Sequence, residues 1–316
     1  MLIKVLDRIA LGLDTPIDVL NKFGEVTVYD STPVELVVER CKDADVIVLN
    51  KVKITSEVLR AAEHLKLVCV FATGFDNIDV ACARELGIAV CNVPGYSSES
   101  VALYTAATLL ALTTRIFEHN AFVRSGEYTL SGSPNKLTPV FHELGGKTWG
   151  IVGYGGIGKA VAGIAKAFGT NVIVNKRTPV DDVRCVDIDT LCRESDIITL
   201  HCPLNDGTRG LINAERIAMM KPDVIIINEA RGAVINERDL ADAVKEGRIA
   251  AFGCDVYSTE PFATQHPYYE IKDMPNVILT PHVAWGAYEA RERCINIIAD
   301  NIASFFNGKI LNRVDI

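Results

Sequence analysis

The sequence predicts an α/β protein with a doubly wound, Rossmann-type parallel sheet and a second, smaller, flavodoxin-like α/β domain. Two observations carry this prediction. Apolar runs of strand length alternate with helical patterns through most of the 316 residues, which is typical of parallel sheets with crossover helices. A glycine cluster also follows one of these runs directly and opens a helix. The length suits two domains.

The glycine cluster lies between an apolar strand pattern at Trp149–Val152 and a second strand pattern at 171–174. Its members are Gly153, Gly155, Gly156 and Gly158 in a GxGxxG spacing, and apolar residues at helical spacing follow from Ile157 onward. In such a unit the three motif glycines permit a tight turn, close approach of the backbone to a pyrophosphate, and close packing of the helix on the sheet. Free N–H groups at the helix start would hold phosphates. The alternative is an ordinary crossover with a glycine-rich turn.

Composition and charge narrow the class of partner. The formal charge of −8 and pI of about 5.3 argue against a nucleic-acid partner, which favours a basic face. No apolar run approaches the length of a membrane helix, and the N-terminus reads as a strand, so no membrane association and no signal peptide are predicted. Nine cysteines without metal-ligand spacing predict reduced, buried thiols, no metal site and a cytoplasmic location.

The first hundred residues predict the smaller domain. Strand patterns recur at 3–6, 26–29, 46–49, 67–71 and 88–93. Helices are expected at 15–23 and 32–41, where Thr15 and Thr32 can cap and a proline follows each. The turns at 72–79 and 92–98 leave strand ends, where parallel sheets bind ligands, so each is either a candidate substrate-holding turn or plain turn chemistry.

The remaining elements predict the larger domain. A mostly apolar helix at 98–115 is expected to be buried between domains or between subunits, and a helix with a more polar excursion is expected at 116–147. Strands are expected at 197–202, 224–228, 249–254 and 277–280, with a helix capped by Asn236 running to Gly247, which gives a sheet of about six strands.

The final helix pattern, at 287–307, comes after the larger sheet is complete. We expect it to pack back on the first domain. The prediction is therefore a substrate domain formed by residues 1–98 and 287–316, discontinuous in sequence, and a dinucleotide-binding domain formed by residues 99–286.

The end of the second strand of the glycine unit indicates the cofactor. A site for NAD has an acidic residue there to bind the ribose hydroxyls, but this chain has Asn175, Lys176 and Arg177 and no carboxylate before Asp181. The two cations would attract a 2′-phosphate. The sequence therefore favours NADP(H); the alternative is NAD(H) bound through the ribose hydroxyls alone, with both cations solvated.

Three short stretches each follow a strand in the larger domain and carry the ionisable groups: Asn228-Glu-Ala-Arg-Gly232, Asp255-Val-Tyr-Ser-Thr-Glu-Pro261 and Thr280-Pro-His-Val283. Together with the glycine cluster, His201-Cys-Pro-Leu204, Thr73–Asp79 and Val93–Ser98, they make the chain resemble the D-isomer-specific 2-hydroxyacid dehydrogenase family over nearly its whole length. Within that family it is most similar to glycerate dehydrogenases, also called hydroxypyruvate or glyoxylate reductases.

The resemblance implies a catalytic role for three residues. Arg231 would grip the substrate carboxylate, since a guanidinium is permanently charged and presents a rigid fork. His282 would give a proton to the C2 oxygen during reduction and take it back during oxidation. Glu260 would bond the other ring nitrogen and favour the protonated imidazole. Each has a plainer alternative, namely a surface arginine, a solvated acid and a satisfied core histidine. His201 is the competing histidine and is interpreted as structural or cofactor-side.

The resemblance also implies binding residues. The expected cofactor contacts are Gly153, Gly155, Gly156, Ile157, Gly158, Lys176, Arg177, Cys202, Pro203, Thr208, Ala230 and Asp255, with Asp255 at the nicotinamide carboxamide. The expected substrate contacts are Lys51, Val52, Gly74, Arg231 and His282. Two positions depart from the family pattern: Leu103-Tyr104 in the long helix, and Glu229, where a small polar residue is usual.

The implied activity is reduction of a short 2-oxoacid to the D-2-hydroxyacid, best matched by hydroxypyruvate or glyoxylate, by a homodimer that associates through the long helix and its neighbour. An enzyme for pyruvate or a branched-chain 2-oxoacid is the first alternative. A cofactor-sensing corepressor that only binds partners is a distant one, and no disordered or low-complexity segment supports it.

Overall fold

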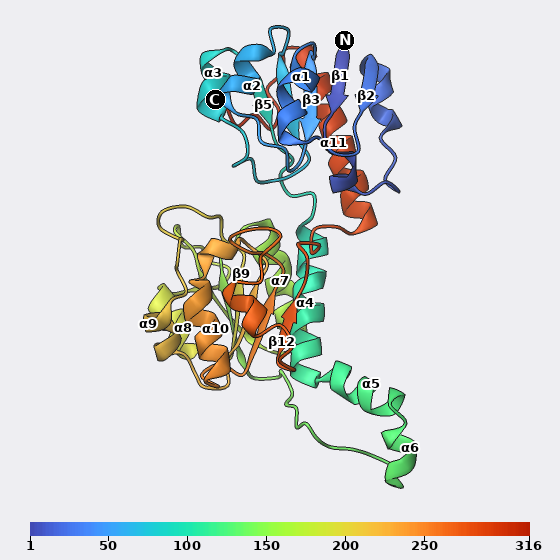
Figure 1. Ribbon diagram of the computed structural model, residues 1–316. Coiled ribbons are helices and arrows are strands. Elements are labelled where there is room, and N and C mark those ends of the chain that lie inside the picture. The colour runs from blue at the N-terminus through green and yellow to red at the C-terminus, as the bar shows by residue number, and fades with distance from the viewer. The chain divides into compact units, whose positions relative to one another are not determined.

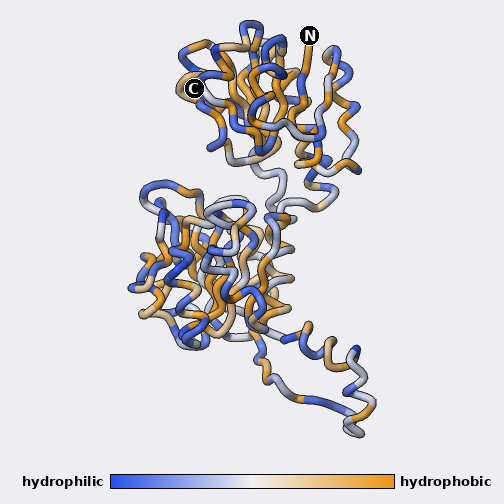
Figure 2. The backbone as a smooth tube through the Cα atoms, viewed as in Figure 1, coloured by the Kyte–Doolittle hydropathy of each residue, from blue (hydrophilic) through white to orange (hydrophobic).

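The computed structural model describes residues 1–316, which fold as two compact units (Figure 1). One unit comprises Met1–Ser97 and Gly286–Ile316, and the other comprises Ser98–Trp285. That the first binds substrate and the second binds a dinucleotide, over the ranges given above, stays a prediction. Both units have a parallel sheet of apolar strands, visible as the orange interior segments of Figure 2.

The first unit has a five-stranded parallel sheet in the order β2-β1-β3-β4-β5. The strands are β1 (Leu2–Val5), β2 (Glu25–Val28), β3 (Val46–Leu49), β4 (Leu67–Val70) and β5 (Ala89–Cys91). The helices are α1 (Val37–Cys41), α2 (Ser56–Ala61), α3 (Val80–Glu85) and α11 (Tyr288–Phe306). Every residue of β3, β4 and β5 is buried, as expected where helices cover both faces of a parallel sheet.

The C-terminal helix α11 belongs to the first unit, as predicted. Its stripe of Cys294, Ile298 and Ile302 is fully buried, and the helix contacts β4 and the 3-10 turn Asp18–Phe23. Arg291 adds hydrogen bonds to Asp14 and Thr15, so the last helix of the chain is joined to its first thirty residues.

The two helices expected early in the chain are shorter than predicted. Residues 15–23 form only a 3-10 helix at Asp18–Phe23, and 32–41 form a 3-10 turn (Val34–Leu36) followed by α1. The predicted caps are wrong, because both threonine hydroxyls donate to carbonyl groups instead: Thr15 Oγ1 to Leu11 O at 3.1 Å, and Thr32 Oγ1 to Leu6 O at 2.6 Å.

The second unit has a seven-stranded parallel sheet in the order β12-β11-β10-β9-β6-β7-β8, one strand more than predicted. The strands are β6 (Thr148–Val152), β7 (Asn171–Asn175), β8 (Arg184–Cys185), β9 (Ile197–Leu200), β10 (Ile225–Asn228), β11 (Ala251–Cys254) and β12 (Val277–Leu279). The helices around it include α4 (Ser98–Thr114), α7 (Gly156–Ala167), α8 (Ile188–Glu194), α9 (Ala214–Met219) and α10 (Glu237–Lys245). The extra strand, β8, is a two-residue edge strand with no apolar run to reveal it.

The apolar helix α4 buries one face within its own unit. It packs against α7 and the strands β10, β11 and β12. Gly253 on β11 allows this contact, since a Cβ there would come within 2.5 Å of Thr108 Cγ2. The buried face of α4 therefore packs on the sheet of its own unit. The sequence had predicted that this helix is buried between domains or between subunits.

Helices α5 (Ile116–Arg124) and α6 (Glu127–Ser131), with the coil up to residue 147, form an arm that projects from the body of the second unit (Figure 1). Neither helix contains a buried residue. Leu130, Leu137 and Val140 are 87%, 79% and 68% exposed, so the arm presents large apolar side chains to solvent.

No single helix is long and apolar enough to cross a membrane; only α4 and α5 taken together, with a 62° bend between them, meet the length and composition.

The glycine turn gives a prediction about stability. A Cβ at Gly158 would lie 2.0 Å from Gly153 O, whereas a Cβ at the exposed Gly163, in the same helix, would meet nothing. Gly158→Ala should therefore lower the free energy of unfolding by about 1–3 kcal/mol through overpacking. Gly163→Ala should raise it slightly, since alanine restricts the unfolded chain. Urea denaturation of both variants checks this, and equal stability of G158A and wild type would contradict it.

Candidate active site

The β6–turn–α7 segment has the geometry expected for a dinucleotide site. Gly153 adopts φ +94°, and a Cβ there would come within 2.6 Å of His201 O, so only glycine fits beside the end of β9. At Gly155 a Cβ would meet no protein atom within 4 Å. The space in front of Gly155 is therefore open, which fits a phosphate group held by the start of α7.

The residues at the end of β7 and directly after it include two cations and no carboxylate. Asn175 Nδ2 donates to Val186 O at 3.0 Å, which fixes the strand end. Lys176 is half-buried and Arg177 is exposed, and neither forms an ion pair. The carboxylate of Asp182 accepts a hydrogen bond from Tyr154 Oη at 3.1 Å and is thereby held against the glycine turn.

The turn after β9 contains three more of the predicted cofactor contacts, Cys202, Pro203 and Thr208. Cys202 is buried, and burial raises the pKa of its thiol to about 11, so the thiol is neutral. Thr208 Oγ1 donates to Pro203 O at 2.7 Å and accepts from Asn205 N at 2.8 Å, which closes the turn. The structure thus gives Pro203 and Thr208 a defined local conformation at the carboxyl end of β9.

His282 and Glu260 lie together at the end of the strands β11 and β12. His282 Nδ1 is 2.8 Å from Glu260 Oε2, and Glu260 Oε1 accepts a hydrogen bond from Tyr257 N at 3.1 Å. The two side chains are 25% and 28% exposed, so they are partly shielded yet accessible. Because Nδ1 is bonded to a carboxylate, the geometry fixes the ring orientation and directs Nε2 away from Glu260.

His282 has an uncommon backbone conformation. Its φ of +55° lies in the left-handed region, which a residue with a Cβ rarely adopts. Such strain persists only where surrounding contacts impose it, and it concentrates at functional sites. Trp285 Nε1 donates to His282 O at 2.9 Å, which is one of the contacts that hold this residue.

Asp255 holds the segment that carries His282. Its Oδ1 accepts from Thr280 Oγ1 at 2.6 Å and from Val283 N at 2.9 Å, and its Oδ2 accepts from Ala284 N at 2.8 Å. The side chain is buried. Asp255, predicted from the resemblance only as a cofactor contact, is therefore also the anchor of the loop after β12.

Arg231 follows β10 in a turn that Asn228 stabilises. Asn228 Nδ2 donates to Arg231 O at 3.0 Å, and its Oδ1 accepts from Ala230 N at 3.1 Å. The next residue, Gly232, packs directly on the loop after β11, where a Cβ would lie 2.0 Å from the carbonyl carbon of Tyr257. The turn bearing Arg231 and the loop bearing Glu260 are thus in backbone contact.

His201 lacks the features of a proton donor. Both ring nitrogens are buried and have no hydrogen-bond partner. Burial lowers the pKa of the ring to about 3, so it is neutral at ordinary pH. The interpretation of His201 as a structural residue agrees with these surroundings.

The substrate residues predicted in the first unit lie in turns after β3 and β4. The backbone of the turn after β3 is hydrogen-bonded to Asp7. Asp7 Oδ2 accepts from Lys51 N at 2.6 Å and from Val52 N at 3.3 Å, and its Oδ1 accepts from Asn50 N at 2.9 Å. The backbone N–H groups of this turn therefore bind the protein's own carboxylate. That Lys51, Val52 and Gly74 contact the substrate stays a prediction.

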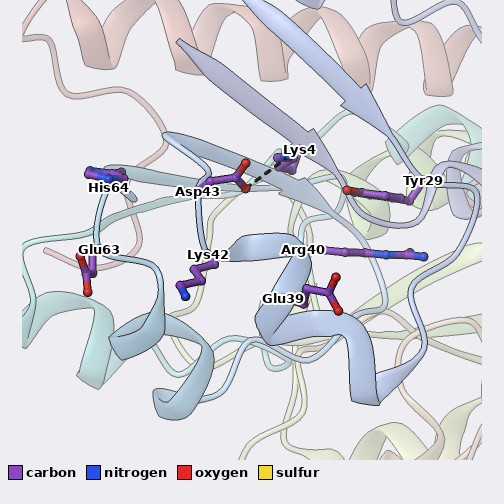
Figure 3. A pocket seen from close by; sticks show the side chains of 8 residues that line it. All are labelled: Lys4, Tyr29, Glu39, Arg40, Lys42, Asp43, Glu63 and His64. Carbon is purple, nitrogen blue, oxygen red and sulfur yellow. Dashed lines mark ion pairs between the residues drawn. The ribbon is translucent and has the colours of Figure 1, made fainter.

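A pocket of about 410 Å³ in the first unit, away from the predicted residues, is lined by charged side chains (Figure 3). Lys4 pairs with Asp43 at 3.3 Å, and Arg40 stacks on Tyr29 at 4.0 Å while donating to Ser31 O at 2.7 Å. Its principal cations are therefore engaged by the protein itself.

Sequence reasoning missed several supporting residues. Asp7, Gly232 and Tyr257, whose hydroxyl donates to Thr280 O at 2.8 Å, all position predicted residues. Their position in the sequence could have identified them, because each lies at the end of a parallel strand or within a few residues of it.

The comparisons with known proteins agree with this geometry. Residues 106–284 match the family model described as D-isomer specific 2-hydroxyacid dehydrogenase, NAD binding domain. The chain is 39% identical to a hydroxypyruvate reductase of Blautia hydrogenotrophica, covering 94% of each chain. It is 38% identical to a glyoxylate reductase of Thermococcus litoralis, covering 93% of this chain and 91% of the relative.

A solved structure gives the same result for the fold. An acyclic imino acid reductase in complex with NADPH and D-Arg superposes with a TM-score of 0.89 at 32% identity, covering 99% of this chain and all of that one. The two parallel-sheet units are thus those of a known architecture. On the family model and the extent of these identities, the chain belongs to the D-isomer-specific 2-hydroxyacid dehydrogenase family.

Proposed function

We propose that the protein reduces a short 2-oxoacid to the D-2-hydroxyacid, with hydroxypyruvate or glyoxylate as substrate. The observation that carries the proposal is the His282–Glu260 pair at 2.8 Å, on a left-handed residue at the carboxyl end of the nucleotide-type sheet. The names of the two relatives support the choice of substrate. Nine cysteines, all without a disulfide, support a reducing, cytoplasmic location.

The roles of the residues follow from their chemistry. A nicotinamide cofactor, held at the glycine turn and the start of α7, would supply the hydride to C2. His282 Nε2 gives its proton to the carbonyl oxygen, so that the oxygen becomes the hydroxyl group of the product, and Glu260 stabilises the protonated ring beforehand. Arg231 binds the substrate carboxylate as a fork of two N–H donors.

For the cofactor, we propose a preference for NADP(H). Lys176 and Arg177 stand at the end of β7 without ion-pair partners, and either can bind a 2′-phosphate. The imino acid reductase of similar fold was solved with NADPH, which supports the proposal. The glycine turn and the start of α7 would hold the pyrophosphate.

We also propose a homodimer. The resemblance placed its interface on the long helix and its neighbour, but one face of α4 packs on its own sheet, so we propose the arm of α5, α6 and the following coil as the contact. A groove of about 590 Å³ on the arm is lined mainly by apolar side chains, including Phe122, Tyr128, Leu137 and Phe141. Isolated apolar patches of this kind are typical of protein–protein contacts.

The first functional prediction tests substrate and cofactor together. In an absorbance assay with a panel of 2-oxoacids, hydroxypyruvate and glyoxylate should give a higher kcat/KM than pyruvate or a branched-chain 2-oxoacid, and NADPH should be preferred to NADH. Arg177→Ala should raise the KM for NADPH and leave the KM for NADH unchanged, because only NADPH carries the 2′-phosphate. A wild-type preference for NADH would refute the cofactor proposal, and no turnover with any 2-oxoacid would refute the function.

The second prediction concerns the proton donor. His282→Ala should lower kcat by about 10²–10⁴-fold, the usual contribution of a general acid. His201→Leu, which replaces a ring with no hydrogen-bond partner, should leave kcat within several-fold of wild type. Steady-state kinetics of both variants checks the assignment, and the reverse outcome would exchange the two roles.

The third prediction concerns assembly. Replacing Leu130 and Val140 by aspartate should convert the dimer to a monomer, since charge at a buried apolar contact is costly. Val34→Asp is the matched control, because Val34 is 82% exposed but lies in the other unit. Light scattering after size-exclusion chromatography reads the mass; a wild-type monomer, or a variant that remains dimeric, would contradict the proposal.

A further inference from the structure

Glu229 is a buried carboxyl group that the proposed chemistry does not use. It directly follows β10, is 8% exposed, and pairs with no cation. Its Oε2 lies 2.5 Å from Thr105 Oγ1 on α4. A buried, unpaired carboxylate is costly, so the presence of this acid calls for a physical account.

Thr105 Oγ1 has one hydrogen and two acceptor oxygens within reach, so both contacts are hydrogen bonds only if Glu229 supplies a second hydrogen. Thr105 Oγ1 is also 2.8 Å from Val101 O, one turn earlier in α4. A carbonyl oxygen only accepts, so the single hydroxyl hydrogen of Thr105 points to Val101 O. The 2.5 Å contact then needs a hydrogen from Glu229. The bond therefore runs from the carboxylic acid O–H to the threonine oxygen.

The ionisable groups near Glu229 are few. Asp255 is the charged neighbour, Cys254 on β11 is a neutral thiol whose pKa burial raises further, and α4 contributes the uncharged Thr105. Asp255 is also the anchor of the segment that carries His282. A charge on Glu229 would thus act on the group that positions the proton donor.

We propose that Glu229 is a proton-bearing positioning residue: as the neutral acid it ties the end of β10 to α4 through Thr105, and its deprotonation disturbs Asp255 and the His282 segment. The two turns concerned are those that carry Arg231 and His282. Deprotonation of Glu229 therefore stops turnover, although Glu229 itself does not contact the substrate. The effect on turnover rests on the function proposed above, whereas the protonation does not.

The electrostatics agree with the geometry. Burial raises the pKa of Glu229 to about 8 from its ordinary value of 4.5; the contact with Thr105 lowers it, and the charge of Asp255 raises it further. The folded protein thus keeps a proton that the unfolded chain releases. The stability contributed by this group is complete below about pH 4.5 and is lost as the pH rises through 8.

Thermal unfolding tests the protonation without reference to the reaction. Glu229→Gln keeps an N–H donor for Thr105 and does not ionise. The Tm of wild type should fall relative to that of E229Q between pH 5 and pH 8, and the gap should stay constant above that range. A gap that does not change with pH would overturn the proposal.

The activity experiment uses oxidation of D-glycerate with NADP⁺. In this direction His282 is the base that takes the proton from the substrate hydroxyl group. At one pH unit above the pKa about a tenth of Glu229 is still protonated, so wild-type kcat should fall about tenfold from pH 7 to pH 9. E229Q should keep its kcat over that range, with KM changed little. An equal alkaline fall in both proteins would overturn the proposal.

Thr105 variants complete the test. Thr105→Ser keeps the acceptor oxygen and should behave as wild type, whereas Thr105→Val removes it and should shift the alkaline fall in kcat. An unaltered profile in T105V would contradict the assigned hydrogen bond. If wild type does not oxidise D-glycerate, the proposed function fails, and the unfolding comparison still decides whether Glu229 holds its proton.

Discussion

The three hydrogen bonds that the Asp255 carboxylate accepts from the Thr280–Ala284 segment set the position of His282. They come from one hydroxyl and two backbone amides, which otherwise would be left without partners where the loop turns back after β12. Tyr257, from the same loop as Asp255, adds a bond to Thr280 O. The loops after β11 and β12 are therefore one hydrogen-bonded unit, and Glu260 and His282 meet because this unit is rigid.

The parallel sheet explains why groups so far apart in sequence meet at all. In a parallel sheet all strands end at the same edge, so residues that follow β10, β11 and β12 are delivered to neighbouring positions. Close approach of these loops requires small residues at the contacts, which is why Gly232 lies against Tyr257 and Gly153 against His201. In the turn after β10, the proposed substrate-binding residue Arg231 is thus followed directly by Gly232, a residue that packing requires to be small.

Much of this was predictable from sequence. Strand patterns and the glycine spacing gave both sheets, the C-terminal helix returned to the first unit, and the ordered motifs gave the family. The failures come from three-dimensional contacts that the linear pattern does not encode. Thr15 and Thr32 looked like caps, but a hydroxyl bonds whichever carbonyl lies nearest in three dimensions. Asp7 accepts hydrogen bonds from the amides of Lys51 and Val52, more than forty residues later, and no sequence pattern predicted this contact. Such long-range partners leave no periodic signal.

The left-handed backbone of His282 has a consequence for how the protein can change. A residue with a Cβ pays roughly 1 kcal/mol or more in this conformation, and glycine does not. Selection for heat tolerance alone would therefore favour glycine at position 282 and discard the imidazole. Under the role proposed for His282, laboratory evolution of this chain needs turnover in the screen, because stability and activity then favour different residues at this position.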